Sequence, residues 1–254
     1  MEVAKQAVKN FWEAAPCGTH DTADLAEFEQ HRELERMRDA REPFIAEFAR
    51  FEQTAGLSVL EVGVGAGTDH LRFARSGARL SGVDLTQAAI DLTTRRLGME
   101  GFTSNLQVAD AEALPFESDS FDVVYSWGVI HHTPDVPRAA REILRVLRPG
   151  GRYCVMVYNR RSLVALQTWL RFAALRGRPG QSLREVIANH MESPGTQAYT
   201  AAEAAQLFPT DDVRVDTRIT AYDLRVGRRR FLPTWTWSLV PASLGWFHMI
   251  SGTK

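Results

Sequence analysis

The stretch Val59-Leu-Glu-Val-Gly-Val-Gly-Ala-Gly-Thr68 decides the fold of this chain. Its first half is a short, apolar and β-branched run, which is typical of a strand buried on both faces of a sheet. Gly63, Gly65 and Gly67 follow at every second position, and they lack the Cβ atoms that keep a ligand away from the backbone. Because residues 69–76 have helical spacing, these glycines are expected between a strand end and a helix N-terminus, where a nucleotide-like ligand binds.

The spacing of the glycines separates two kinds of nucleotide-binding loop. The dinucleotide fingerprint is G-x-G-x-x-G, whereas here the third glycine comes one residue early and Thr68 takes its position. Glu61 precedes the first glycine by two residues, where a carboxylate is unfavourable near a pyrophosphate but suits the cationic end of S-adenosylmethionine. Asp84 follows a second apolar strand, 79–83, at the distance at which a carboxylate reaches ribose hydroxyls. These features favour S-adenosylmethionine over a nicotinamide cofactor.

From residue 57 onward the pattern alternates between strands and helices. Strands are expected at 58–62, 79–83, 106–109, 123–125 and 153–158, with amphipathic helices between them. This alternation predicts a parallel sheet with helices on both faces, and its ligand residues then gather outside the carboxyl ends of the strands. Three further helices are expected in an insertion at about 161–210, followed by a strand at 213–219.

Five ordered motifs between about Leu57 and Tyr158 resemble those of the class I S-adenosylmethionine-dependent methyltransferases: Glu61 to Gly67, Gly82 to Leu85, Asp110 to Phe116, Phe121 to Ser126 and Leu147 to Gly151. The likeness is greatest to the small-molecule branch that includes the ubiquinone and menaquinone biosynthesis methyltransferases. The resemblance implies a Rossmann-like, mostly parallel seven-stranded sheet whose last strand, near 246–251, is antiparallel. Residues 57–254 then form the donor-binding domain, and the helices of 1–56 form a lid that covers the donor and helps build the acceptor pocket.

The resemblance also implies which residues contact the donor. The glycines admit its methionine portion, Glu61 meets its amino end, Asp84 takes the ribose, and Asp110 and Ala111 border the adenine. The complete set of expected donor-binding residues is Glu61, Gly63, Gly65, Gly67, Asp84, Leu85, Asp110, Ala111 and Ser126. An alternative role for Asp84 is to cap the helix that begins after Thr86, and the two roles can coexist.

Methyl transfer is an in-line displacement at an activated carbon, so it leaves no obligatory catalytic motif. His131 and His132, after the fourth strand, are candidate general bases, with packing or helix capping as the alternative role. His20 is a third candidate, and its alternative is a solvated loop residue. The candidates for the acceptor pocket are Trp12, Tyr158, Asn159 and Tyr199.

No metal site is expected near the two histidines. Side chains at neighbouring positions are expected to diverge, and the sequence offers no third ligand. The metal-dependent catechol enzymes place an aspartate near the end of the fourth strand, where this chain has Ser126.

Composition narrows the acceptor and the setting. The formal net charge is −1 and the pI is about 6.7, so no global field attracts the protein to nucleic acid or to anionic lipid, and local patches are judged separately. A small, rather apolar acceptor is expected, with O-methylation ahead of C- or N-methylation. A methyltransferase of RNA or of a protein side chain is the rival within the class. The arginine cluster at 225–230 favours it, whereas the near-neutral charge and the missing Asn-Pro-Pro-Tyr element after the fourth strand disfavour it. A non-catalytic donor-binding module is the rival from another class, and a cytoplasmic location is expected.

One segment, about 225–250, is both basic and aromatic. Arg225-Val-Gly-Arg-Arg-Arg230 precedes twenty residues without Asp, Glu, Lys or Arg, among them three tryptophans. That length matches a membrane span, but two prolines and a glycine within it disfavour a spanning helix. One hypothesis is peripheral membrane contact through Arg225 to Trp237, and the alternative is packing as a pocket wall or subunit contact.

Overall fold

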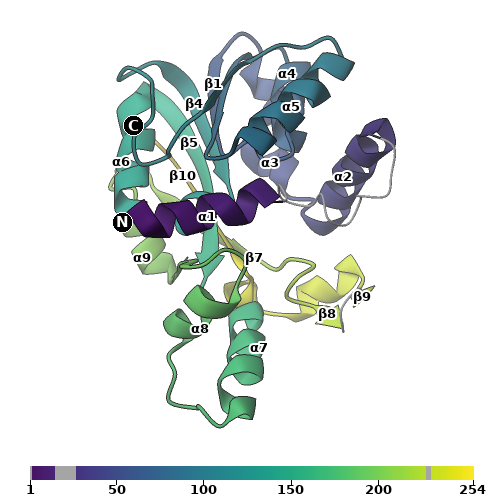
Figure 1. The fold of residues 1–254 in the computed structure, drawn as a ribbon, viewed down its shortest axis with the longest axis vertical. Helices are drawn as coiled ribbons and strands as arrows, with labels where there is room; N and C mark the ends of the chain where they lie inside the picture. Colours follow the sequence, from purple (N-terminus) through teal and green to yellow (C-terminus); the bar gives the residue numbers. More distant parts are fainter. Residues whose placement is uncertain (1, 15–26, 227–229) are drawn as a thin grey trace.

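The structure is a computed structural model that describes residues 2–14, 27–226 and 230–254. A central sheet carries helices on both faces (Figure 1). In the described part of the chain, seven strands follow one another in the order β3-β2-β1-β4-β5-β10-β7, and an eighth, β6, pairs with the end of β5. This architecture confirms the predicted α/β fold with a mostly parallel sheet.

The strands coincide with the apolar runs of the sequence. Their bounds are β1 Ser58–Val62, β2 Arg79–Asp84, β3 Asn105–Val108, β4 Phe121–Trp127, β5 Leu147–Asn159, β7 Arg214–Arg218 and β10 Phe247–Thr253. As expected for the last strand, β10 runs antiparallel to its neighbours β5 and β7. The sequence does not predict β6 (Ala198–Tyr199) or the hairpin of β8 (Arg225–Val226) and β9 (Arg230–Phe231), because two-residue strands carry no periodic signal.

The order of the strands reverses between β1 and β4. From β1 the chain moves outward through β2 to β3, and it then returns to form β4 on the other side of β1. The connections after β1 and β4 therefore leave the sheet in opposite directions. Open α/β sheets bind their ligands in the crevice at such a point, outside the carboxyl ends of the strands.

The helices fall into three groups along the chain. Before the first strand come α1 (Glu2–Ala14), α2 (Glu27–Arg41), α3 (Ile45–Ala49) and the 3-10 helix η2 (Phe51–Thr54). The parallel strands are connected by α4 (Thr68–Arg75), α5 (Gln87–Met99) and α6 (Val136–Val146). Between β5 and β7 lie α7 (Leu163–Phe172), α8 (Leu183–His190) and α9 (Ala201–Gln206), which occupy the expected insertion. No helix in the described ranges is long and apolar enough to cross a membrane.

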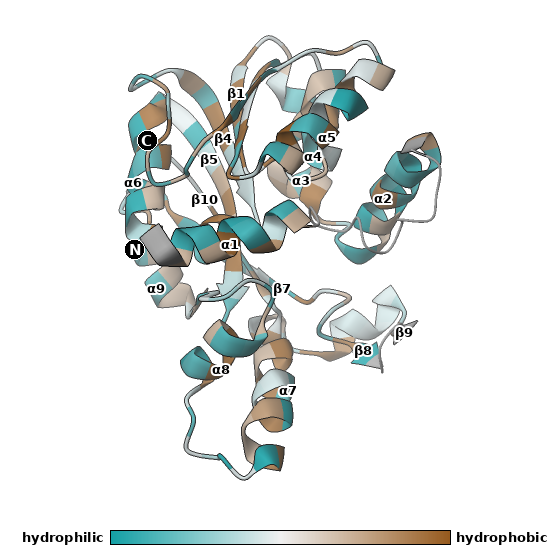
Figure 2. Ribbon diagram, in the orientation of Figure 1, coloured by the Kyte–Doolittle hydropathy of each residue, from teal (hydrophilic) through white to brown (hydrophobic). Residues whose placement is uncertain are grey.

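Side chains that alternate along the strands supply two cores. In β1, Val59 packs on one face with Ile45 of α3 and Phe73 of α4. The next residue, Leu60, packs on the opposite face with Ile143 of α6. Figure 2 shows the inner strands in brown, whereas the helices around them carry teal on their outer sides. Because both faces of the sheet are buried, its inner strands read as nearly continuous apolar runs.

Helix α1 crosses the ligand side of the sheet (Figure 1) and is tied to the domain near both of its ends. Lys5 forms ion pairs of 2.5 Å with Asp110, which follows β3, and with Glu112. At the other end, the carboxylate of Glu13 accepts hydrogen bonds from the backbone N–H groups of Gln87 and Ala88, at the start of α5. These ties place α1 where the sequence predicts a lid.

Candidate active site

A cavity of about 960 Å³ lies at the carboxyl ends of the parallel strands. One end is lined by seven of the expected donor-binding residues: Glu61, Gly63, Gly65, Asp84, Leu85, Asp110 and Ala111. The other end is lined by residues of β5, α7, the segment after α8 and the start of β10, among them Tyr158, Phe172, Glu192, Trp246 and Phe247. The two ends are continuous, and the volume is at the upper end of the range for small-molecule sites.

The three glycines of the loop have different roles. All three have positive φ, and a Cβ atom on Gly65 would meet no atom within 4 Å. A Cβ on Gly63 would lie 2.1 Å from Val129, and one on Gly67 would lie 2.9 Å from Thr93 of α5. Gly65 therefore leaves a space in the cavity wall that fits a ligand. Gly63 and Gly67 allow close packing instead, and Gly67, expected to contact the donor, does not line the cavity.

Asp84 holds two loops of the donor end together. Its Oδ2 accepts a hydrogen bond of 3.0 Å from the N–H of Gly65, and its Oδ1 accepts from both the N–H and the hydroxyl of Thr86. Thr86, rather than Asp84, caps α5, because its hydroxyl oxygen accepts from the N–H of Ala89. Burial raises the pKa of Asp84, although these hydrogen bonds oppose the shift.

Glu61 is hydrogen-bonded to a buried histidine, His70. Ser104 donates its hydroxyl proton to the carbonyl of Leu80, so Ser104 Oγ must accept from His70 Nε2, 2.9 Å away. A neutral imidazole then presents a lone pair at Nδ1, which lies 2.8 Å from Glu61 Oε2. Burial lowers the pKa of His70 to about 3 and raises the pKa of Glu61 well above its usual range, with Asp69 adding to the latter shift. Glu61 therefore has a buried histidine partner that the sequence does not predict, and its contact with the donor stays a prediction.

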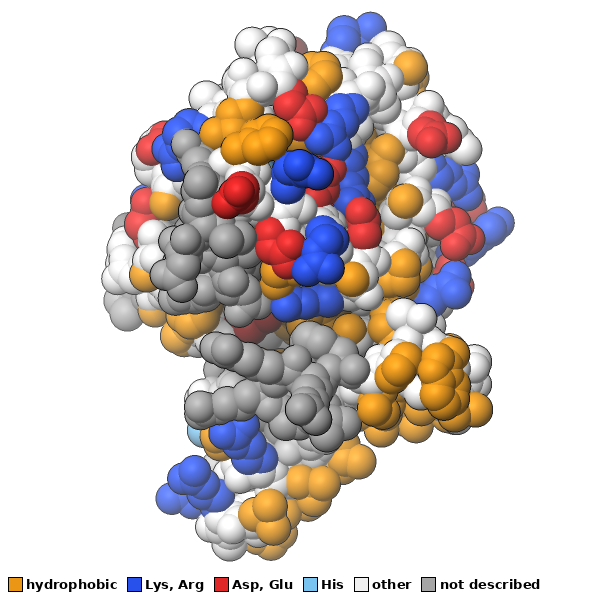
Figure 3. Space-filling model, turned by 90° about the vertical axis from the view of Figure 1, so that its right-hand side faces the viewer, with side chains coloured by type: hydrophobic (Ala, Val, Ile, Leu, Met, Phe, Trp, Pro, Cys, Tyr) orange, Lys and Arg blue, Asp and Glu red, His pale blue; other side chains and the backbone are white. Residues whose placement is uncertain are grey.

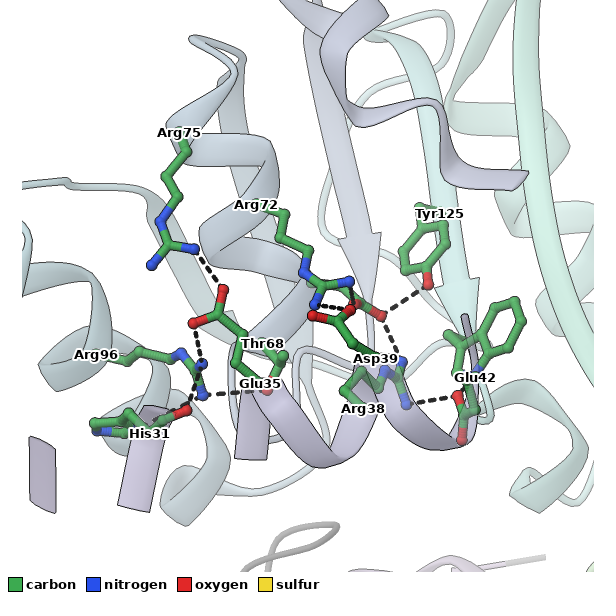
Figure 4. Close-up of polar contacts among 12 residues, drawn as sticks. His31, Glu35, Arg38, Asp39, Glu42, Thr68, Arg72, Arg75, Arg96 and Tyr125 are labelled. Carbon is green, nitrogen blue, oxygen red and sulfur yellow. Dashed lines mark hydrogen bonds and ion pairs between the residues drawn. The ribbon is translucent and has the colours of Figure 1, made fainter. Parts of the chain in front are cut away.

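A buried charge cluster joins α2 to the sheet (Figure 4). Arg38 forms an ion pair of 2.5 Å with Asp69, at the start of α4, and a second of 3.0 Å with Glu42. Asp69 also accepts from the hydroxyl of Tyr125, and Glu42 accepts from the indole N–H of Trp127, both on β4. All except Tyr125 line the cavity. The sequence shows only a charged helix here, because nothing in its spacing says that Arg38 points inward.

At the acceptor end, a histidine, a glutamate and a tyrosine meet. His132 Nε2 lies 3.3 Å from Glu192 Oε2, which also accepts a hydrogen bond of 2.8 Å from the hydroxyl of Tyr158. Burial acts to raise the pKa of Glu192, but the contacts with His132 and Tyr158 outweigh it and lower the pKa. The Glu192 side chain is 40% exposed, and its residue lines the cavity.

The backbone conformation of Glu192 and the contacts of His132 Nδ1 help to position His132 and Glu192. Glu192 has a φ of 38°, a left-handed conformation that costs energy for a residue with a side chain and often marks functional sites. His132 Nδ1 lies 2.8 Å from Ser193 Oγ and 3.0 Å from Thr196 Oγ1. The sequence predicts His132 as a candidate base but misses Glu192, which belongs to no motif and meets His132 only through the fold.

Four other predicted residues have structural surroundings or lie outside the described part of the chain. Ser126 is buried and donates to the carbonyl of Val62. Asn159 is 1% exposed and donates to the carbonyls of Ser243 and Gly245. Neither residue lines the cavity, nor does Tyr199, whose hydroxyl bonds to a neighbouring side chain. His20 falls outside the described ranges, whereas Trp12 lines the cavity with its ring centroid 5.3 Å from that of His132.

His131 packs in the core beneath the acceptor end. Its ring centroid lies 3.9 Å from that of Tyr158 and 4.2 Å from that of His132. The expected divergence of the two histidines is therefore wrong, because the 3-10 helix Ile130–His132 turns both rings to the same side. Burial lowers the pKa of His131 well below its usual value, and the residue does not line the cavity. In the described ranges, no group of three His, Cys, Asp or Glu side chains is arranged to hold a metal ion.

Comparison with known families identifies the central part of the chain. Residues 60–155 match the family model described as a methyltransferase domain. Methyltransferase GfsG of Streptomyces halstedii is 35% identical over 111 residues, which are 42% of this chain and 40% of that protein. The phthiotriol/phenolphthiotriol dimycocerosates methyltransferase of Mycobacterium leprae is 41% identical over 99 residues, 38% of this chain and 36% of that protein. The chain thus spans about two fifths of the length of these relatives.

Solved structures share the fold over most of the chain. The crystal structure of the [4+2]-cyclase SpnF matches with a TM-score of 0.56 at 18% identity, over 87% of this chain and 80% of that one. At this identity the likeness concerns the fold alone.

Proposed function

Because residues 60–155 form a class I S-adenosylmethionine-dependent methyltransferase domain, we propose that the whole protein transfers a methyl group to a small-molecule acceptor. The observation that supports this proposal is the continuous cavity, which connects the glycine loop with the pair of His132 and Glu192. Donor and acceptor would meet inside one continuous cavity, which would hold them in the alignment that in-line displacement requires. The narrower likeness to the ubiquinone and menaquinone enzymes stays a prediction.

Each part of the donor end suits one part of S-adenosylmethionine. Asp84 and the open space at Gly65 suit the ribose and the methionine chain, and Asp110 and Ala111 suit the adenine. Arg38 lines the same cavity, and its buried Nε has no hydrogen-bond partner among the described residues. We propose that Arg38 binds the donor carboxylate, since an unsatisfied guanidinium N–H is an anion donor. When bound, the donor supplies the methyl group already activated by its sulfonium.

The acceptor end suits an apolar molecule that carries a hydroxyl group. Apolar and aromatic side chains make up much of its wall, including Met156, Val164, Phe172, Trp246 and Phe247. A few polar groups among them would orient the acceptor. The carboxylate of Glu192 is the acidic group that faces this space, next to His132. This lining supports O-methylation of an apolar small molecule.

The proton of such a hydroxyl has a place to go. We propose that the acceptor hydroxyl donates a hydrogen bond to Glu192, and that its proton passes by way of Glu192 to His132 Nε2, 3.3 Å from Glu192 Oε2. The oxygen would take the methyl group as the bond from that carbon to the donor sulfur breaks, which would leave a neutral thioether. Tyr158 would hold Glu192 in position through its hydrogen bond. The imidazolium that forms would be stabilised by the Glu192 carboxylate, and Nδ1 would be held by Ser193 and Thr196.

The proposal is tested with S-adenosylmethionine that carries a labelled methyl group. The protein is incubated with a metabolite extract, and labelled products are identified by mass spectrometry. We expect a labelled apolar molecule that is absent when Asp84→Ala replaces the wild type. If S-adenosylmethionine binds but labels no molecule, the protein is a non-catalytic donor-binding module. Label on RNA or protein alone would overturn the small-molecule assignment.

A further inference from the structure

An exposed apolar surface lies at the acceptor end of the molecule. Its side chains come from α7, from the 3-10 helix η4 (Ala174–Arg176) that follows it, and from the 3-10 helix η5 (Thr234–Leu239) with the residue Leu232. We call six residues the apolar surface: Leu166, Leu170, Leu175, Leu232, Trp235 and Leu239. Figure 3 shows hydrophobic side chains gathered in the lower half of one face, in the part of the molecule where Figure 1 places α7 and the β8–β9 hairpin.

Three of the six side chains are more exposed than any other large hydrophobic side chain in the described ranges. Leu175 is 83% exposed, Leu239 is 73% exposed and Trp235 is 70% exposed. A tryptophan with this exposure presents a large amphipathic ring to its surroundings, a placement typical of binding surfaces.

The loop that precedes the β8–β9 hairpin contacts α7 at the cavity. The amide of Gln167, on α7, donates a hydrogen bond of 3.2 Å to the carbonyl of Asp223. Gln167 and Arg171 of α7 line the cavity together with Tyr222. The part of the apolar surface on α7 therefore lies next to the acceptor end.

Cations without acidic partners flank the apolar surface. Residues 159–180 contain five arginines and no Asp or Glu. Arg160 pairs with Glu203, but the other four form no ion pair with any residue in the described ranges. These four exposed arginines are Arg161, Arg171, Arg176 and Arg178. The uncharged run 231–250 adds no acid on the other side.

We propose that the apolar surface binds an anionic lipid bilayer at the level of its headgroups. The leucines and Trp235 would enter the boundary between headgroups and acyl chains, and Arg176 and Arg178 would pair with lipid phosphates. The charge pattern argues for a bilayer, since an anionic lipid surface attracts an array of cations without needing a shape-matched partner. Binding of this kind is independent of methyl transfer.

One consequence does rest on the proposed function. Because α7 contributes to both the apolar surface and the cavity wall, an apolar acceptor dissolved in the bilayer could enter the acceptor end without crossing water. Failure of the methyltransferase assignment would remove this consequence and leave bilayer binding unaffected.

The proposal is tested by vesicle flotation of the full-length protein without donor. Vesicles of phosphatidylcholine alone are compared with vesicles that also contain phosphatidylglycerol, at low and at high salt. We expect binding to the anionic vesicles at low salt, and release by salt, because exposed charges are screened. The double variant Arg176→Glu with Arg178→Glu should bind at least about thirtyfold more weakly, because each change removes an attraction and adds a repulsion.

Two further variants distinguish the explanations. Arg79→Glu with Arg141→Glu reverses the same charge at exposed positions elsewhere and should bind like the wild type. Trp235→Ser with Leu239→Ser should also lose vesicle binding, and circular dichroism shows whether each variant is folded. The proposal is overturned if the wild type stays unbound at low salt, or if both arginine pairs weaken binding equally. A dimer in solution that only the Trp235 and Leu239 variant dissociates, without vesicle binding, would assign the surface to a second copy instead.

Discussion

Arg38 of α2 and Asp69 of α4 form an ion pair of 2.5 Å in the cavity wall, with the Asp69 side chain only 2% exposed. This pair links a helix outside the nucleotide-binding unit to the helix that begins at the glycine loop. Arg38 outweighs the effect of burial and lowers the pKa of Asp69. The N-terminal helices are thus held by charge in the place where the donor is expected to bind.

Asp69→Asn should destabilise the protein by about 3 kcal/mol or more, because it leaves Arg38 buried with fewer charged partners. The measurement is chemical unfolding followed by circular dichroism. Asp39→Asn is the matched control, since Asp39 pairs with Arg72 while 64% of its side chain is exposed. That change should cost less than about 1 kcal/mol. If both variants lose the same free energy of unfolding, the buried ion pair of Asp69 contributes no more to stability than the exposed pair of Asp39.

Asp84→Ala should weaken S-adenosylmethionine binding by about ten- to a hundredfold, because it removes a charge-assisted hydrogen bond to the ribose. Asp84→Ala also removes the hydrogen bonds that Gly65 and Thr86 donate to Asp84. Asp84→Asn keeps an acceptor oxygen, so its affinity for S-adenosylmethionine should fall less. Isothermal titration calorimetry measures both. Asp91→Asn on the exposed side of α5 is the control, and unchanged affinity in folded Asp84→Ala would remove this residue from the donor site.

Glu192→Gln should lower kcat by about a hundredfold or more while S-adenosylmethionine affinity stays unchanged, since general base catalysis contributes at this scale. The lowered pKa of Glu192 keeps its carboxylate charged down to a lower pH than usual. The carboxylate is protonated, and can no longer accept a proton, when the pH falls below this pKa. The kcat of the wild type should therefore decline at acid pH. The part of this decline that comes from protonation of Glu192 should be absent in Glu192→Gln. Glu117→Gln, at a remote exposed position, serves as control. A variant with the wild-type kcat and pH profile would contradict the proposed proton path.

Lys5→Met should accelerate dissociation of S-adenosylmethionine, because it removes both ion pairs that tie α1 to the loop after β3 while keeping a similar side-chain length. Stopped-flow fluorescence measures the dissociation rate. Lys9→Met alters the same helix without touching those ion pairs and should dissociate at the wild-type rate. If the two variants behave alike, α1 does not act as a lid through Lys5.

Asp223→Asn should stabilise the protein at neutral pH. Burial raises the pKa of Asp223 to about 6, so the folded state resists losing this proton. The stability associated with the protonated form is present below the unfolded pKa of about 4 and is lost as the pH rises to about 6, by up to about 3 kcal/mol. Asparagine can still accept from Thr220 and Trp246 but does not ionise.

Thermal unfolding of wild type and Asp223→Asn across pH 4 to 8 checks this expectation. The variant should have the higher Tm above about pH 6, and the difference should shrink toward pH 4. A difference that does not vary with pH would show that Asp223 titrates normally.

Much of the donor end could be predicted from the sequence because its signals are local. Asp84 ends β2, whereas Gly65 and Asp110 follow the ends of β1 and β3 within three residues, and the alternation of elements places these strand ends together at one edge of the sheet. The antiparallel last strand was likewise expected through the family resemblance, and the structure confirms it.

The acceptor end and the buried charges could be assigned only with the tertiary structure. His132 and Glu192 are 60 residues apart, and Arg38 and Asp69 are 31 apart, with no periodic pattern linking either pair. The sequence alone also cannot separate Tyr158, which faces the cavity, from Asn159, which is turned away from it, although both end the same strand. Local periodicity specifies which face of an element is apolar, whereas contacts between distant polar side chains depend on how the elements pack, and that is decided only when the whole chain folds.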